Sequence, residues 1–153
     1  MSREAAEDLP YINQYKNKII KAAKNYGMKP SVVAGIISRE TRGGRGAGLV
    51  NGWGNNGKTF GLMQIHKDWH EPEGEWDSQE HINQGTWILA DCYRIVGREF
   101  PRLTGTMKLR GALAAYNKGT KDMKANNVDG HTDGGNYSSD VLARAQYYEG
   151  KGY

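Results

Sequence analysis

The stretch PSVVAGIISRETR, residues 30–42, predicts a helix that carries a carboxyl group on its apolar face. Pro30 suits the first turn of a helix, and the apolar residues after it recur at helical spacing. Glu40 lies four residues after Ile36 and three after Ile37, so these three side chains share one face. The sequence therefore places an acid among apolar neighbours in the last turn of this helix.

An acid in this position has two alternative roles. Desolvation and the negative end of the helix dipole are both expected to raise the pKa of Glu40. The resulting neutral carboxyl group could protonate a glycosidic oxygen, which leaves poorly as an unprotonated alkoxide. Alternatively, Glu40 reaches water or pairs with Arg39, Arg42 or Arg45. Spacing alone leaves both interpretations open, and Glu40 is the candidate catalytic acid.

The rest of the chain predicts a mainly α fold, of the α+β class, with one small β-hairpin. Glycines crowd residues 43–61, which indicates a loop and a hairpin rather than a helix. A turn is expected at Asn55-Asn56-Gly57, followed by a return strand over 59–66. No repeat or linker interrupts the sequence, so residues 1–153 are expected to form a single domain. Four further helices are expected, over 9–26, 77–100 with a capping box at its start, 106–116, and 138–148 with Ser138 or Ser139 as its cap.

Composition argues against several classes of site and partner. The single cysteine, Cys92, excludes an intrachain disulfide and is expected to be a buried thiol. His66 and His70 are four residues apart, but Lys67 stands where a zinc-protease motif needs glutamate, so no metal site is expected. The net charge of +4 comes from basic residues spread among acids. That charge favours an anionic partner by steering, and we expect neither nucleic-acid nor membrane binding.

Several ordered motifs resemble those of goose-type lysozymes. The resemblance runs from about Tyr15 to the C-terminal Gly-Tyr, and the missing disulfides make the chain most similar to fish members of that family. The motifs are AGIISRE (34–40), NGWG (51–54), FGLMQ (60–64), QGT (84–86), AYN (115–117) and DVLARAQY (140–147).

The resemblance implies a lysozyme-like fold with a substrate cleft between a helical body and the hairpin. It implies antibacterial hydrolysis, with inversion, of the β-1,4 bond between N-acetylmuramic acid and N-acetylglucosamine in peptidoglycan. It also implies a monomer that needs no cofactor and binds peptidoglycan or N-acetylglucosamine oligomers. The substrate-binding residues that it implies are Gln64, His70, Tyr116, Asn117 and Tyr137. Asn55 is a further candidate, because its side-chain amide could position a sugar or the attacking water, although it cannot take a proton.

The expected place of action is the bacterial cell wall. The first ten residues are polar and lack the apolar core of a signal peptide. An extracellular location, release by a non-classical route and an intracellular location are therefore all open. No apolar run is long enough to span a membrane.

One departure from the family concerns the group that activates water. Bird members carry two aspartates on the hairpin, and by motif these fall at Asn55 and His66, neither of which is a carboxylate. Asp68 is the nearest substitute and the candidate base, because a strand continuing past His66 would put both side chains on one face. Alternatively, Asp68 is a solvated residue beside Lys67.

The same departure leaves two other functions open. A lytic transglycosylase needs no protein base, because the substrate's own 6-hydroxyl group attacks. A non-catalytic protein that binds bacterial wall or chitin would need neither a catalytic acid nor a base.

Overall fold

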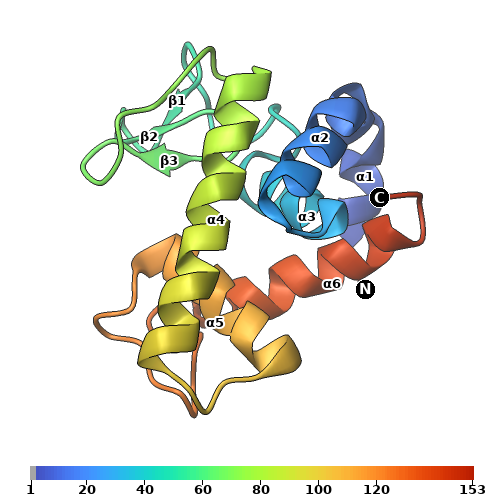
Figure 1. Cartoon of the computed structure of the whole chain (residues 1–153). Coiled ribbons are helices and arrows are strands. Elements are labelled where there is room, and N and C mark those ends of the chain that lie inside the picture. Colours follow the sequence, from blue (N-terminus) through green and yellow to red (C-terminus); the bar gives the residue numbers. More distant parts are fainter. Residues whose placement is uncertain (1–2) are drawn as a thin grey trace.

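The computed structural model describes residues 3–153 and shows a helical body with a small sheet on one side (Figure 1). The three strands lie beside the upper part of the long helix α4 in this view, and α5 lies beside its lower part. The helices are α1 (Arg3–Ile12), α2 (Lys16–Tyr26), α3 (Pro30–Thr41), α4 (Gln79–Glu99), α5 (Gly105–Lys118) and α6 (Tyr137–Glu149), with short 3-10 turns η1 (Asn13–Tyr15) and η2 (Asp133–Gly135). Within residues 3–153, no helix is long and apolar enough to cross a membrane.

Helix α3, which the periodicity of residues 30–42 predicts, is the centre of the core. Nearly all of its residues are buried, and α1, α2 and α6 pack around it. Gly35 permits the close approach of α6, because a β-carbon at this position would lie 2.7 Å from the carbonyl oxygen of Val141. The helix ends at Thr41, and Arg42 takes a left-handed conformation after it. Glu40 therefore lies in the last helical turn.

The helix expected over residues 9–26 is wrong at its start and in its continuity. Helix α1 begins at Arg3, and the turn η1 separates it from α2. Pro10 lies inside α1 and has no amide hydrogen for the helical ladder. The early start reflects Asp8, which is fully buried and pairs with Arg42 and Arg45, just after the end of α3. The contacts that hold these polar residues in a helix are thus distant in sequence.

The hairpin contains one more strand than the sequence predicts. Strands β1 (Trp53–Gly54), β2 (Thr59–Phe60) and β3 (Ile65–His66) form an antiparallel sheet in that order. The turn at 55–57 is confirmed, with all three residues at positive φ. The strand expected over 59–66 is wrong, because a second turn with positive φ at Gly61 and Gln64 divides it into β2 and β3.

The starts of α4 and α6 show local and distant capping. Ser78 caps α4 by accepting a hydrogen bond from the backbone of His81, as expected near this position. The expected cap of α6 by Ser138 or Ser139 is wrong. Asp129, buried nine residues upstream, accepts hydrogen bonds from the backbone N–H of Ser138 at 2.8 Å and of Ser139 at 3.2 Å. A carboxylate at a helix N-terminus is favourable. Burial has the largest single effect on the pKa of Asp129 and raises it, but these two bonds together with those from the Ser138 hydroxyl group and Arg110 lower the pKa below its ordinary value.

Candidate active site

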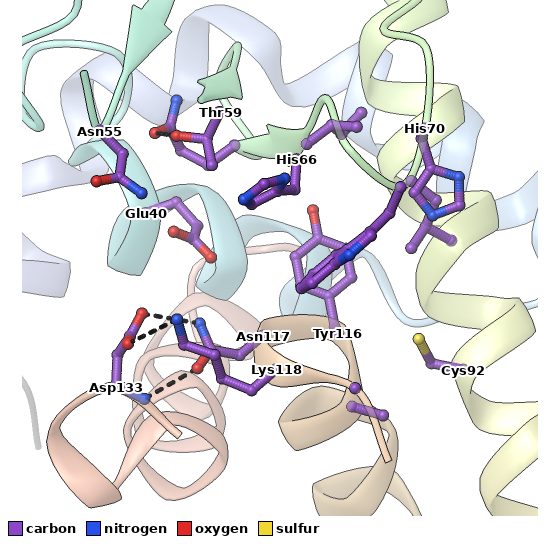
Figure 2. A pocket seen from close by; sticks show the side chains of 16 residues that line it. Glu40, Asn55, Thr59, His66, His70, Cys92, Tyr116, Asn117, Lys118 and Asp133 are labelled. Carbon is purple, nitrogen blue, oxygen red and sulfur yellow. Dashed lines mark hydrogen bonds and ion pairs between the residues drawn. The ribbon is translucent and has the colours of Figure 1, made fainter. Parts of the chain in front are cut away.

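A cleft of about 650 Å³ lies between the end of α3, the hairpin, α4 and α5. Figure 2 shows Glu40 between two walls, with Asn55, Thr59 and His66 of the hairpin above it in this view and Asn117, Lys118 and Asp133 below it. A pocket of this size accommodates a ligand as large as a short oligosaccharide. The cleft brings together most of the predicted site residues: Glu40, Asn55, Gln64, His70, Tyr116 and Asn117.

The arginines near Glu40 in sequence are all paired with other acids. Arg39 contacts Asp140 at 2.8 Å. Arg42 and Arg45 both contact the buried carboxylate of Asp8, at 2.7 and 2.8 Å. In the described part of the chain no arginine forms an ion pair with Glu40, so the alternative role as a salt-bridge partner does not apply.

Burial raises the pKa of Glu40 from 4.5 to about 7, and this desolvation outweighs the groups that oppose it. The hydrogen bond from Tyr137 and the positive charges of Arg39 and Lys118 lower the pKa, whereas the charge of Asp133 raises it. A carboxyl group with a pKa near 7 is substantially protonated at neutral pH. It can therefore act as a general acid there.

Tyr137 is not placed where a substrate could touch it. Its side chain is 1% exposed, and its hydroxyl group donates a hydrogen bond of 2.7 Å to Oε2 of Glu40. The prediction of Tyr137 as a substrate-binding residue is therefore wrong, because this side chain is packed behind the acid. Its position instead fixes the rotamer of Glu40 and leaves the other carboxyl oxygen, Oε1, without a bond to Tyr137.

The AYN motif connects α5 to both walls of the cleft. The hydroxyl group of Tyr116 donates to the carbonyl oxygen of Met63 at 2.7 Å and so ties α5 to the hairpin. Asn117 donates to Oδ2 of Asp133 at 3.2 Å and accepts from its backbone N–H at 3.0 Å. Both predicted binding residues line the cleft, but most of their hydrogen-bonding groups hold the walls in place.

The predicted residues of the hairpin wall differ in how free they are. The amide of Gln64 is engaged by the hydroxyl group of Thr59 and by the carbonyl oxygen of Gly61, so it supports the turn between β2 and β3. His70 lines the cleft with its ring packed edge-on against Trp87. Asn55 is exposed at the tip of the β1–β2 turn and projects toward the cleft (Figure 2).

Asp68 does not reach the cleft. Strand β3 ends at His66, and a turn follows in which the carbonyl oxygen of His66 accepts from the backbone of Trp69 and His70, each at 3.1 Å. The expectation that Asp68 extends the face of His66 is therefore wrong. The side chain of Asp68 is 67% exposed, and its carboxylate lies 3.8 Å from Nδ1 of His66.

Sequence reasoning missed the second carboxylate of the cleft. Among the described residues that line it, only Glu40 and Asp133 carry a carboxyl group. Asp133 forms an ion pair with Lys118 at 3.2 Å, and its backbone carbonyl accepts a hydrogen bond from Arg39. Its place in a polar, glycine-rich segment gives no sequence signal, and the contact with Asn117 of the AYN motif depends on the fold.

Cys92 also lines the cleft, but its thiol is unreactive. Burial raises the pKa of its thiol to about 12, so it is not a nucleophile at neutral pH. Among residues 3–153, no group of three or more histidine, cysteine, aspartate or glutamate side chains could hold a metal ion. Glu40 can exchange a proton near neutral pH, and polar groups line both walls of the cleft.

Comparison with known proteins gives one consistent family. A family model described as "Lysozyme g" matches residues 2–152. The chain is 44% identical over 154 residues to lysozyme G of Dromaius novaehollandiae, covering 99% of this chain and 74% of that protein. It is 45% identical over 150 residues to lysozyme g of Cyprinus carpio, covering 97% and 80%. Lysozyme g-like protein 2 of Mus musculus is 37% identical over 149 residues, covering 97% and 67%.

Proposed function

Since this chain belongs to the lysozyme g family, we propose that Glu40 is the general acid with which it cleaves peptidoglycan. The chain is a glycoside hydrolase, a muramidase whose substrate is the bacterial cell wall. The observation that carries the role of Glu40 is its raised pKa of about 7 in an open cleft, with Tyr137 as its hydrogen-bond donor. We propose that the protein acts as a monomer on glycan strands and needs neither metal nor organic cofactor.

The reaction begins when Glu40 gives its proton to the oxygen of the β-1,4 bond. That oxygen leaves with the neighbouring sugar as an alcohol, and positive charge develops at the anomeric carbon. A water molecule then adds from the opposite face of the sugar and gives its proton to solvent, from which the Glu40 carboxylate is protonated again. Addition from that face converts a β linkage into an α product, which is inversion.

The hairpin wall is where we place the attacking water. Asn55 and His66 line this wall, and both can hydrogen-bond a water molecule. The backbone N–H of Asp68 donates to Nδ1 of His66 at 3.2 Å, so the neutral ring carries its proton on Nε2. Asn55 and His66 thus orient water, and Asp68, outside the cleft, is not assigned the role of base.

The same wall supports one alternative. It carries no carboxylate among the cleft-lining residues described, so attack by the substrate's own 6-hydroxyl group remains chemically open. Such a lytic transglycosylase reaction would leave 1,6-anhydro ends. Hydrolysis by water would leave reducing ends.

Product analysis tests the proposal and separates these reactions. Mass spectrometry of digested peptidoglycan is expected to show reducing ends, and NMR of the first product is expected to show the α anomer. An initial β anomer would contradict inversion, and 1,6-anhydro ends would identify a transglycosylase.

Asp68→Asn is expected to retain activity within about twofold, because surface substitutions away from special features have small effects. A large loss in this variant would restore Asp68 as the base.

A further inference from the structure

An exposed tryptophan lies at the rim of the cleft and has no part in the reaction described above. Trp69 lines the cleft, yet its side chain remains 58% exposed. Its ring stacks on the imidazole of His66, with centroids 4.7 Å apart and planes inclined by 24°. One face of the indole is thus covered by His66, and much of the rest of the side chain meets solvent.

Backbone hydrogen bonds hold this Trp69–His66 stack in place. The N–H groups of Trp69 and His70 both donate to the carbonyl oxygen of His66, which forms the tight turn after β3. The N–H of Asp68 donates to Nδ1 of His66 and fixes the orientation of the imidazole. The stack is therefore ordered without a ligand, so binding to it would cost little conformational entropy.

Core packing does not account for Trp69. It belongs to neither cluster of buried apolar residues, and an indole left largely in water gains little from the hydrophobic effect. Aromatic rings exposed in a binding cleft offer a large, rigid contact area with few rotatable bonds. The position of Trp69 therefore suits binding of a ligand better than it suits packing of the core.

The chemistry of the surroundings selects the ligand. The face of a pyranose ring that carries its C–H groups is apolar and can lie flat on an aromatic ring, while its hydroxyl and acetamido groups need hydrogen-bonding partners. Asn55 and Thr59 line the same cleft and offer such partners. Because Glu40 and Trp69 line the same cleft, a glycan strand cut at Glu40 can extend over Trp69.

We propose that Trp69, supported by His66, is a binding residue that stacks against one N-acetylated sugar of the glycan strand, away from the bond that is cleaved. This inference rests on the proposed function of the cleft. Trp69 would thereby set how long a substrate must be for tight binding. A contact that is equal in the ground state and the transition state changes KM and leaves kcat unaffected.

Binding of N-acetylglucosamine oligomers of increasing length tests this proposal without turnover. Calorimetry would compare the Glu40→Gln protein with the double variant Glu40→Gln, Trp69→Ala. Loss of the stack is expected to weaken binding of the longer oligomers roughly tenfold, in line with the energy of aromatic contacts. Oligomers too short to reach from Glu40 to Trp69 are expected to bind equally to both proteins. In otherwise wild-type enzyme, Trp69→Ala should raise KM by a similar factor and preserve kcat.

Two controls make the result specific. Trp69→Phe retains an aromatic face and is expected to restore most of the affinity. Tyr26→Ala removes an aromatic side chain of α2 that is 37% exposed and does not line the cleft, and it should bind like the parent. Equal binding of long oligomers with and without Trp69, or no binding to the parent, would overturn the inference. Hydrolysis of bacterial wall by the wild-type protein is measured separately. If the protein cleaves wall but Trp69 has no effect on binding, the role of Trp69 fails and the proposed function stands.

Discussion

Replacing Glu40 with glutamine is expected to reduce hydrolysis of bacterial wall by roughly 10²–10⁴-fold, the usual contribution of general acid catalysis. Glutamine keeps the size of the side chain and can still accept the hydrogen bond of Tyr137, but it has no proton to give at neutral pH. The decrease in turbidity of a wall suspension measures the effect. The loss should appear in kcat, because the proton is transferred in the transition state.

The same replacement is expected to make the folded protein more stable above neutral pH. The pKa of Glu40 is about 7 in the folded state and 4.5 when unperturbed, so the unfolded chain releases this proton at lower pH. Ionisation of the buried Glu40 carboxyl group therefore destabilises the folded protein. This loss of stability is absent below pH 4.5 and grows until the pH exceeds 7, where it approaches the order of 3 kcal/mol. Glutamine has no such penalty, and urea unfolding at several pH values should show the difference.

These opposite effects distinguish catalysis from folding. Glu75→Gln, which alters an exposed glutamate outside the cleft, is a matched control and should change neither activity nor stability appreciably. A Glu40→Gln protein that still clears the wall suspension at the wild-type rate would remove Glu40 as the acid. It would also support a different catalytic group in the same cleft.

Replacing Asp8 with asparagine is expected to destabilise the protein by about 3–5 kcal/mol, the cost of breaking a buried ion pair. Asp8 is fully buried and contacts Arg42 at 2.7 Å, Arg45 at 2.8 Å and the hydroxyl group of Ser38 at 2.7 Å. Asparagine has nearly the same shape, but it leaves the guanidinium groups without their charged partner. The decrease in the free energy of unfolding is measured by urea titration.

The control for Asp8 is a neighbouring acid on the surface of the same helix. Glu7 is 47% exposed and pairs with Arg42 at 3.0 Å, so water screens this contact and Glu7→Gln is expected to destabilise the protein much less than Asp8→Asn. A comparable loss in both variants would show that burial of Asp8 is not what makes its contacts important. The network matters for function because Arg42 directly follows α3, the helix that ends beside Glu40.

The sequence predicts the parts of the fold that depend on contacts close in the chain. The spacing of apolar residues predicts α3 within one residue, and the run of asparagine and glycine predicts the turn at 55–57. It does not predict the start of α1 or the cap of α6. Those depend on Asp8 and Asp129, whose partners come from other segments.

The candidate site divides in the same way. The position of Glu40 follows from helical spacing, and most of the residues implied by family resemblance do line the cleft. Tyr137 differs because only packing shows that it lies behind Glu40 rather than in front of it. Asp68 differs because the turn after His66 ends the strand, and no residue pattern announces that turn.

The most direct test of the account is the titration of the Glu40 carboxyl group itself. Carbon-13 NMR of protein labelled at the glutamate side chains would follow its resonance, assigned by its absence from the Glu40→Gln variant. We expect a midpoint near pH 7, because burial raises the pKa of Glu40 more than the hydrogen bond from Tyr137 lowers it. A midpoint near 4.5 would contradict this expectation, because Glu40 would then be ionised at neutral pH and could not supply the proton.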